Sequence, residues 1–196
     1  MAADWTERGF QRRIIGYHGF RLDGLSDCLT RCAGASVLDI GCNRGMVSYE
    51  FALSGANVLH GCDNYEKGML VANEVFADLR NVKARFEVVD LKGGGGAIEA
   101  AFGGDLLKTY DFVLMLAVYH KLRRIMEFDQ LLDFVQFLAA RCGRYFVWRG
   151  SGQEMDEFEP RLNGFKLVHY SEMAEVLLPG NSKPTPQPSA VWLRGG

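Results

Sequence analysis

The stretch VLDIGCNRG, Val37-Leu38-Asp39-Ile40-Gly41-Cys42-Asn43-Arg44-Gly45, joins a short apolar run to a turn that contains two glycines. A run of this kind is typical of a strand that is covered on both faces of a sheet. The residues that follow, 46–54, place Val47 and Phe51 one helical turn apart. A strand, a glycine-rich turn and a helix in this order predict a unit of an α/β sheet. In such sheets the turn lies at the edge where ligands bind.

The same alternation of strand and helix continues along the chain. The runs predicted to be strands are Ser36–Ile40, Asn57–Cys62, Ala84–Val89, Asp111–Leu116, Arg144–Trp148, Phe165–Tyr170 and Ala190–Arg194. The stretches predicted to be helices are Gly24–Ala33, Met46–Ser54, Lys67–Leu79 and Glu127–Arg141, while Gly93–Gly96 is predicted to be a loop. Because no long helix separates the last two strands, we expect them to pair antiparallel. The predicted fold is therefore α/β, a Rossmann-like doubly wound seven-stranded sheet, mostly parallel, with an antiparallel C-terminal edge hairpin.

Composition narrows the class of protein. The chain has 196 residues, of which 48% are hydrophobic and 23% charged, and its net charge is −2. These values are typical of a globular domain, and the charge gives no overall attraction to nucleic acid or acidic lipid. No apolar run reaches the roughly 20 residues that span a bilayer. Residues 1–13 are charged without an apolar core, so no signal peptide is predicted.

The five cysteines predict free thiols in a reducing compartment, and therefore a cytoplasmic protein, because their number is odd and they form no tight framework. Cys28 and Cys32 are spaced to share one helix face, as half of a zinc site would be. No second Cys/His pair has metal-ligand spacing, so we expect no metal.

Three successive predicted strands end in an aspartate. These aspartates are Asp39, Asp63 in Gly61-Cys62-Asp63, and Asp90 in Val88-Val89-Asp90-Leu91. An acidic residue at the end of the second strand, 22 positions after Gly41, is placed to accept hydrogen bonds from ribose hydroxyls. Asp90 is placed to meet an adenine amino group, with Leu91 against the ring. Since the carboxyl ends of parallel strands share one edge, the three aspartates predict a nucleoside site.

The spacing of the glycines indicates which kind of nucleoside. A dinucleotide fingerprint needs glycines at the first, third and sixth positions of its loop, and here these positions hold Gly41, Asn43 and Met46. No Gly-Lys-Ser/Thr follows, as a phosphate-binding P-loop requires. A ligand with a ribose and an adenine but no phosphate fits these residues better.

In these motifs the chain resembles the class I S-adenosylmethionine (SAM)-dependent methyltransferases. VLDIGCNRG looks like their first motif, HGCD the end of their second strand, VVDL their adenine-side motif, and YDFVLMLAVYHKL their fourth-strand motif. GFKLVHY and AVWLRG look like their closing hairpin. The resemblance implies a methyltransferase domain over residues 24–196, preceded by a lead segment, residues 1–23. One departure is that the middle glycine of the family's loop is Asn43 here.

The resemblance implies SAM as the cofactor and a role for each matching residue. Asp39 would hold the methionine ammonium group directly or through water, while Gly41 and Gly45 would let the backbone pass the methionine moiety. The remaining implied contacts are the ribose at Asp63 with Asn64, the adenine at Asp90 with Leu91, and backbone groups at Leu116 and Ala117. Asn43 lies within the same loop. Tyr17, His18 and Arg21 are either lid residues or part of a surface helix.

Tyr119 and His120 follow the fourth predicted strand, near where a transferred methyl group should lie. A hydroxyl acceptor needs a base, and histidine titrates near neutrality. Both residues are therefore candidate catalytic residues, and the alternative is that they pack or cap the next helix. Lys121, Arg123 and Arg124 either hold an anionic group of the acceptor or form a solvated helical turn.

The sequence leaves three classes of function open. The favoured one is methyl transfer to an O or N atom of a small-molecule or glycan-type acceptor. Little chain is spare for an acceptor domain, and the stretch 150–164 carries Glu154, Asp156, Glu157 and Glu159, which disfavour a phosphate backbone. The alternatives are an RNA or protein methyltransferase and a non-catalytic SAM-fold binding module.

Overall fold

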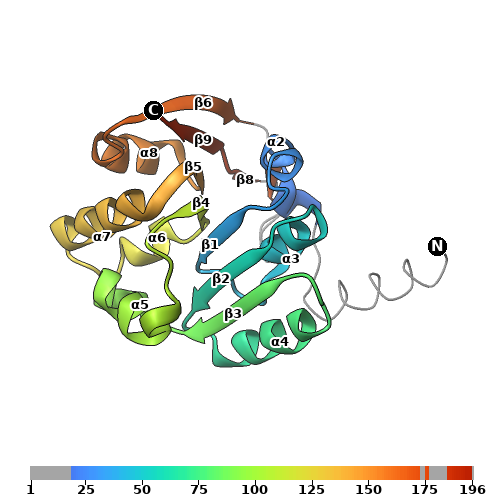
Figure 1. Ribbon diagram of the computed structural model, residues 1–196. Coiled ribbons are helices and arrows are strands. Elements are labelled where there is room, and N and C mark those ends of the chain that lie inside the picture. Colours follow the sequence, from blue (N-terminus) through green and yellow to red (C-terminus); the bar gives the residue numbers. More distant parts are fainter. Residues whose placement is uncertain (1–18, 173–174, 177–184, 196) are drawn as a thin grey trace.

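The computed structural model describes residues 19–172, 175–176 and 185–195. Its main element is one seven-stranded sheet in the order β3-β2-β1-β4-β5-β9-β6 (Figure 1). The strands of this sheet are β1 (Ser36–Ile40), β2 (Val58–Asp63), β3 (Lys83–Val88), β4 (Tyr110–Leu116), β5 (Cys142–Arg149), β6 (Phe165–Ser171) and β9 (Ser189–Arg194). Two short strands, β7 (Glu175–Val176) and β8 (Thr185–Pro186), pair separately.

The sheet has the predicted mixture of strand directions. The pairs within β3-β2-β1-β4-β5 are all parallel, whereas β9 runs antiparallel to both β5 and β6. The chain builds the sheet outward from β1 to β3 and then returns to place β4 on the other side of β1. The boundary between β1 and β4 is thus the topological switch point, where doubly wound sheets bind ligands. The predicted fold class is confirmed.

Helices cover both faces of the sheet (Figure 1). On one face lie α2 (Ser26–Thr30), α3 (Met46–Leu53) and α4 (Glu66–Ala77), and on the other lie α5 (Gly94–Phe102), α6 (Tyr119–Leu122), α7 (Phe128–Arg141) and α8 (Gly152–Phe158). Short 3-10 turns are η1 (Gly19–Leu22), η2 (Leu91–Gly93), η3 (Gly103–Asp105) and η4 (Glu159–Arg161).

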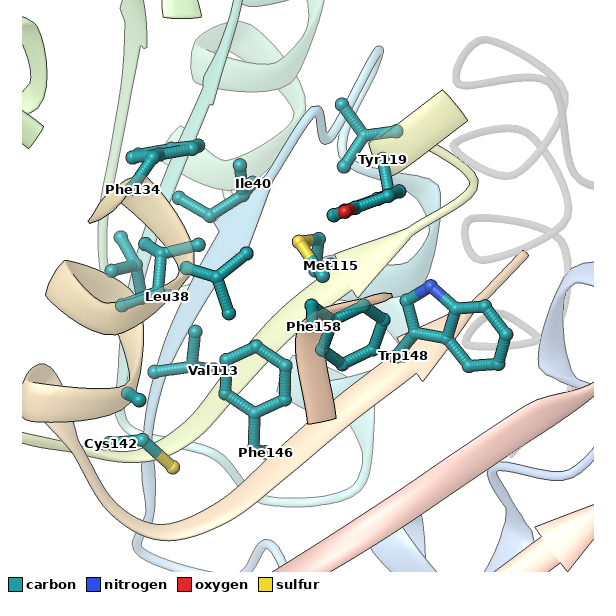
Figure 2. Close-up of a cluster of buried hydrophobic side chains, with 14 of the residues drawn as sticks. Leu38, Ile40, Val113, Met115, Tyr119, Phe134, Cys142, Phe146, Trp148 and Phe158 are labelled. Carbon is teal, nitrogen blue, oxygen red and sulfur yellow. The ribbon is translucent and has the colours of Figure 1, made fainter. Parts of the chain in front are cut away.

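Alternate residues of the central strands enter two separate apolar clusters. Leu38 packs on the α5–α7 side, whereas its neighbour Val37 packs on the α3–α4 side. Figure 2 shows the first cluster, in which Phe146 and Trp148 of β5 meet Phe158 of α8. Burial on both faces explains why the strands read as nearly continuous apolar runs.

The predicted loop at Gly93–Gly96 is wrong, because helix α5 begins at Gly94. Because glycine is a poor helix former, four successive glycines do not predict a helix. A β-carbon at Gly95 would collide with the ring of Phe137 on α7, so the close approach of α5 to α7 requires a glycine. Tertiary packing has therefore overridden local propensity in α5.

All five cysteines are free and buried, as the sequence predicted. Burial raises the pKa of the Cys28 thiol to about 12, so this thiol stays protonated at neutral pH. No group of three or more metal-ligating side chains occurs among residues 19–172, 175–176 and 185–195. Within the same residues, no helix combines the length and apolar character that crossing a membrane requires.

His60 makes a buried polar contact within the sheet. Its Nδ1 lies 2.6 Å from the hydroxyl of Tyr110, which in turn accepts a hydrogen bond from the backbone N–H of Leu107. The direction of the bond between the ring and the hydroxyl depends on the tautomer of His60. Burial, followed by the charge of Arg85, lowers the pKa of His60. The fold thus favours the neutral ring.

This pair predicts an acid-sensitive part of the stability. The contribution of His60 is complete above the ordinary histidine pKa of about 6.5 and is lost as pH falls through its lowered folded-state pKa. We expect His60→Gln to lower the melting temperature strongly at pH 8 and less at pH 5. Thermal unfolding of wild type and His60→Gln between pH 5 and 8 measures the difference in melting temperature. A difference that does not change with pH would show that folding does not alter the pKa of His60.

Candidate functional site

The turns after β1 and β4 meet at the switch point. Gly41 has a φ of 72°, a left-handed conformation that glycine adopts without strain. A β-carbon at this position would lie 2.7 Å from Cγ2 of Val118, which belongs to the turn after β4. The backbone N–H groups of Gly41 and Cys42 both donate to the carbonyl of Cys62 at the end of β2. The three strand ends are therefore joined in one compact edge.

Backbone strain is concentrated at this edge. Among the described residues, Asn43 and Ala117 are the two non-glycine residues with positive φ, at 55° and 56°. One follows β1 and the other follows β4. Asparagine tolerates the left-handed region better than most residues, which explains how Asn43 adopts this conformation in the turn. Alanine has no such preference, and strain of this kind is found most often at functional sites.

Asp63 lies at the centre of the edge. Its Oδ2 accepts a hydrogen bond from the backbone N–H of Asn43 at 2.9 Å, and its Oδ1 accepts one from the N–H of Tyr65 at 3.0 Å. The carboxylate thus fixes the glycine-rich turn against the end of β2. Each oxygen has a second lone-pair direction, so the group retains the capacity to accept hydrogen bonds from a ligand. Asn64 is exposed beside it.

Asp39 is a buried carboxylate near the end of β1, with only 3% of the residue exposed. Its Oδ2 accepts a hydrogen bond of 2.7 Å from the hydroxyl of Ser48 on α3. Burial raises the pKa of Asp39 to about 6, while the Ser48 hydrogen bond opposes this rise. A carboxylate held at such a cost is a ready partner for a cation.

Asp90 and Leu91 lie at the same edge but in different environments. Asp90 is exposed, and its Oδ1 caps η2 by accepting from the backbone N–H of Lys92 at 3.0 Å. Leu91 is 94% buried in the cluster between the sheet and α7. Of this pair, the structure therefore places Asp90 at the surface, whereas the Leu91 side chain belongs mainly to the core.

Leu116 ends β4 and Ala117 follows it, and both residues are partly exposed. The N–H of Ala117 donates to the carbonyl of Arg149 at the end of β5. The buried guanidinium of Arg149 donates in turn to the carbonyls of Arg21 and Asp23, so β5 holds the described end of the lead segment. Of the predicted lid residues, Tyr17 and His18 lie outside the described residues.

The fold resembles several solved structures. One is magnesium protoporphyrin IX methyltransferase (ChlM) from Synechocystis PCC 6803 with bound SAM, at 18% identity and a TM-score of 0.61, covering 94% of this chain and 89% of that one. A second is TehB from Haemophilus influenzae, at 14% identity and a TM-score of 0.61, covering 92% of this chain and 63% of that one. A third is ribosomal protein L11 methylase from Lactobacillus delbrueckii subsp. bulgaricus, at 14% identity and a TM-score of 0.57, covering 90% of this chain and 78% of that one. No protein-family model and no curated protein sequence matches the chain significantly.

The chain has the class I methyltransferase fold. The likeness covers 94% of the chain, and the sequence motifs implied a similar extent. At these identities the comparison concerns the fold, so the role of each residue rests on the geometry of this chain.

In this class I methyltransferase fold, Gly41 provides a test of the contact between the turns. We expect Gly41→Ala to be more destabilising than Gly164→Ala, although φ is similarly positive at the two positions, 72° and 79°, and a side chain is strained at both. Only the first meets Val118, whereas nothing lies within 4 Å of a β-carbon at Gly164. Urea unfolding of the two variants makes the comparison, and equal losses would show that the turns do not pack as described.

Tyr119 and His120 differ in their surroundings although they are adjacent. Tyr119 is fully buried against Phe158 in the core (Figure 2), and its hydroxyl donates to Oε2 of Glu157 at 2.9 Å. Burial, reinforced by Glu157, raises the pKa of Tyr119. The packing role therefore accounts for Tyr119, and its catalytic role stays a prediction.

The side chain of His120 is 33% exposed. Burial of the ring and the positive charges of Lys121 and Arg124 lower the pKa of His120, so the imidazole is neutral at neutral pH and able to accept a proton. Arg123, the third basic residue, is engaged elsewhere. It forms an ion pair with Glu157 and lies 4.6 Å above the ring of Phe128.

Three of the four acidic residues in the stretch 150–164 make contacts within the fold. Helix α8 buries Glu154, directs Glu157 to Tyr119 and Arg123, and is followed by Glu159, which accepts a hydrogen bond from the indole of Trp192. Asp156 stays exposed. Sequence reasoning missed both Glu154 and Arg149 as residues of this edge. Only their positions in the sequence could have indicated this, because Arg149 ends β5 and Glu154 follows five residues later in α8.

Proposed function

We propose that the protein is a SAM-dependent methyltransferase that transfers a methyl group to an O or N atom of a small-molecule or glycan-type acceptor. The observation that carries this proposal is the carboxylate of Asp63 at the switch point, fixed by the N–H groups of Asn43 and Tyr65. A carboxylate fixed there is suited to accept hydrogen bonds from the two hydroxyls of a ribose.

The residues fit the rest of the cofactor as well. The buried carboxylate of Asp39 would hold the ammonium group of the methionine moiety, directly or through water, and the pair would offset the cost of burying the carboxylate. Asn64 would assist Asp63, and Asp90 would meet the adenine amino group from its exposed position. Leu116 and Ala117 would contribute backbone groups near the ammonium group.

When bound, the cofactor supplies a methyl group activated by its sulfonium charge. The residues of this chain then need only align the acceptor and handle its proton. His120 is the candidate base, because its ring is neutral and partly exposed close to the end of β4. A lone-pair nucleophile such as an amine would not require this base.

Charge favours a small acceptor over RNA. The net charge of the chain is −2. Next to His120, Lys121 and Arg124 are exposed, whereas the exposed Arg123 is paired with Glu157. Two cations suffice for one anionic group of a metabolite but neutralise little of a phosphate backbone. Proteins of this fold differ in acceptor: by their names, ChlM acts on magnesium protoporphyrin IX and L11 methylase on a ribosomal protein. The fold alone therefore does not choose the acceptor.

Calorimetric titration with SAM and with its demethylated product, S-adenosylhomocysteine (SAH), tests the proposal. We expect saturable one-to-one binding of both compounds, and no binding of NAD at the same concentration. If neither SAM nor SAH binds at millimolar concentration, the proposed function is wrong. If SAM binds, assays of methyl transfer from radiolabelled SAM to pooled hydroxy acids, amines, sugars and RNA distinguish the acceptor classes.

A further inference from the structure

The end of β5 brings a buried carboxylate close to His120. Oε1 of Glu154, on α8, lies 3.9 Å from Nδ1 of His120, which follows β4. This distance suits an ion pair when the histidine is protonated and exceeds that of a direct hydrogen bond. Only 11% of the Glu154 side chain is exposed. The carboxylate thus faces a ring that is itself open to solvent on one side.

Several neighbours fix the position of Glu154. The hydroxyl of Ser151 donates to Oε1 at 3.1 Å, and a β-carbon at Gly150 would collide with Oε2. Oε2 is buried without a hydrogen-bond partner among the described residues. The indole N–H of Trp148 lies close enough to favour the charged carboxylate but outside hydrogen-bond geometry. A side chain at position 150 would displace the Glu154 carboxylate, and Ser151 holds it by one hydrogen bond.

We propose that Glu154 is a positioning residue that orients His120 and stabilises its protonated ring, so that His120 acts as the base for a hydroxyl acceptor. This inference deepens the proposed function and rests on it. While the ring of His120 is neutral, it does not compensate the negative charge of the buried Glu154 carboxylate. A proton that arrives on His120 gives the carboxylate a positively charged partner. The acceptor class is accordingly an alcohol or a phenol, because these nucleophiles must lose a proton as they react.

The proton and the electrons balance in this step. The O–H bond of the acceptor breaks, and its proton passes to Nε2 of His120. The electron pair left on the oxygen forms the bond to the methyl carbon, while the carbon–sulfur bond breaks and its pair returns to the sulfur of the SAM sulfonium. The imidazolium then faces Glu154 through Nδ1–H and later releases its proton to water.

Other charges around the ring set its titration. Burial and the charges of Lys121 and Arg124 lower the pKa of His120. A charged Glu154 carboxylate 3.9 Å from Nδ1 would attract a protonated ring and so act against them. Burial raises the pKa of Glu154, and Glu157 on the same helix adds to this rise while it binds Tyr119 and Arg123. Loss of the charge of Glu154 should therefore leave the imidazolium less stable.

A pH titration of the histidine ring signals by NMR tests this role without an acceptor. The His120 signal is assigned by its absence in His120→Gln. In Glu154→Gln we expect the midpoint of His120 to move to lower pH. The matched control is Asp156→Asn, which removes one negative charge from an exposed position of the same helix and should leave the midpoint within error. Ser151→Ala, a milder change, should move it in the same direction as Glu154→Gln.

Calorimetry with SAH on the same proteins separates this inference from the proposed function. We expect Glu154→Gln to bind SAH like the wild type, because no cofactor contact is assigned to Glu154. A wild-type protein that does not bind SAH would overturn the proposed function and this inference with it. If SAH binds but the His120 midpoint is the same in wild type, Glu154→Gln and Ser151→Ala, the inference alone is wrong.

Discussion

Replacement of Asp63 with alanine is expected to weaken the binding of SAH about a hundredfold. Two hydrogen bonds from ribose hydroxyls to a carboxylate would be lost, and hydrogen bonds to charged groups contribute roughly 1.5–3 kcal/mol each, partly offset by water. The variant also releases the N–H groups of Asn43 and Tyr65, so the glycine-rich turn loses its attachment to β2. Calorimetric titration measures the affinity directly.

Asp111→Ala is the matched control for Asp63→Ala. Asp111 also joins two strand ends, since its Oδ2 accepts from the N–H and the hydroxyl of Ser36 at 2.8 and 2.9 Å. These contacts lie at the start of β1 and β4, at the opposite edge of the sheet from Asp63. We expect this variant to lower the melting temperature and to leave the affinity for SAH unchanged. Equal affinities of wild type and Asp63→Ala would refute the proposed ribose contact.

Asp39→Asn is expected to change stability and affinity in opposite directions. The amide keeps the size of the side chain and an oxygen to accept from Ser48, but it removes a buried charge. The free protein should therefore melt at a higher temperature at pH 8. The affinity for SAH should fall by about tenfold to a hundredfold, because the ammonium group loses a charged partner.

The pH dependence of the Asp39 effects follows from its raised pKa of about 6. In the free protein the folded state holds the proton more tightly than the unfolded state, so the contribution of Asp39 to stability falls as pH rises from about 4 through 6. The stability gain of Asp39→Asn should hence be present at pH 8 and absent near pH 4. Wild-type affinity should decrease as pH falls through 6, whereas that of Asp39→Asn should stay constant. A wild-type affinity that is flat from pH 5 to 8 would contradict the ammonium contact.

Much of the fold could be predicted because its signals are local. The predicted bounds of β1 agree with the structure, and most other strands differ by one or two residues at an end. Apolar runs separated by helical spacing are sufficient to indicate a parallel sheet with two covered faces. Helix α5 was missed because its first turn consists of glycines, which are poor helix formers. One of them, Gly95, lies against Phe137, a contact with a residue distant in sequence.

The residues assigned to the cofactor were more predictable than those around His120 for a physical reason. Asp39, Asp63 and Asp90 each lie at or next to the end of a strand, so the parallel sheet alone brings them to one edge. The positions of the residues near the proposed acceptor depend on turn conformation and helix placement. After the left-handed Ala117, Tyr119 is buried and His120 is partly exposed. The partner of His120 comes from α8, which only the folded structure places beside it.

A crystal structure of the protein with SAH tests the central claim most directly, namely that the switch point between β1 and β4 binds a nucleoside ligand. We predict ribose hydroxyls within hydrogen-bond distance of the Asp63 carboxylate and the amino group of SAH next to Asp39. The adenine should lie beside Asp90. Density for SAH at any other place, or an edge that stays empty at saturating SAH, would contradict the proposed site.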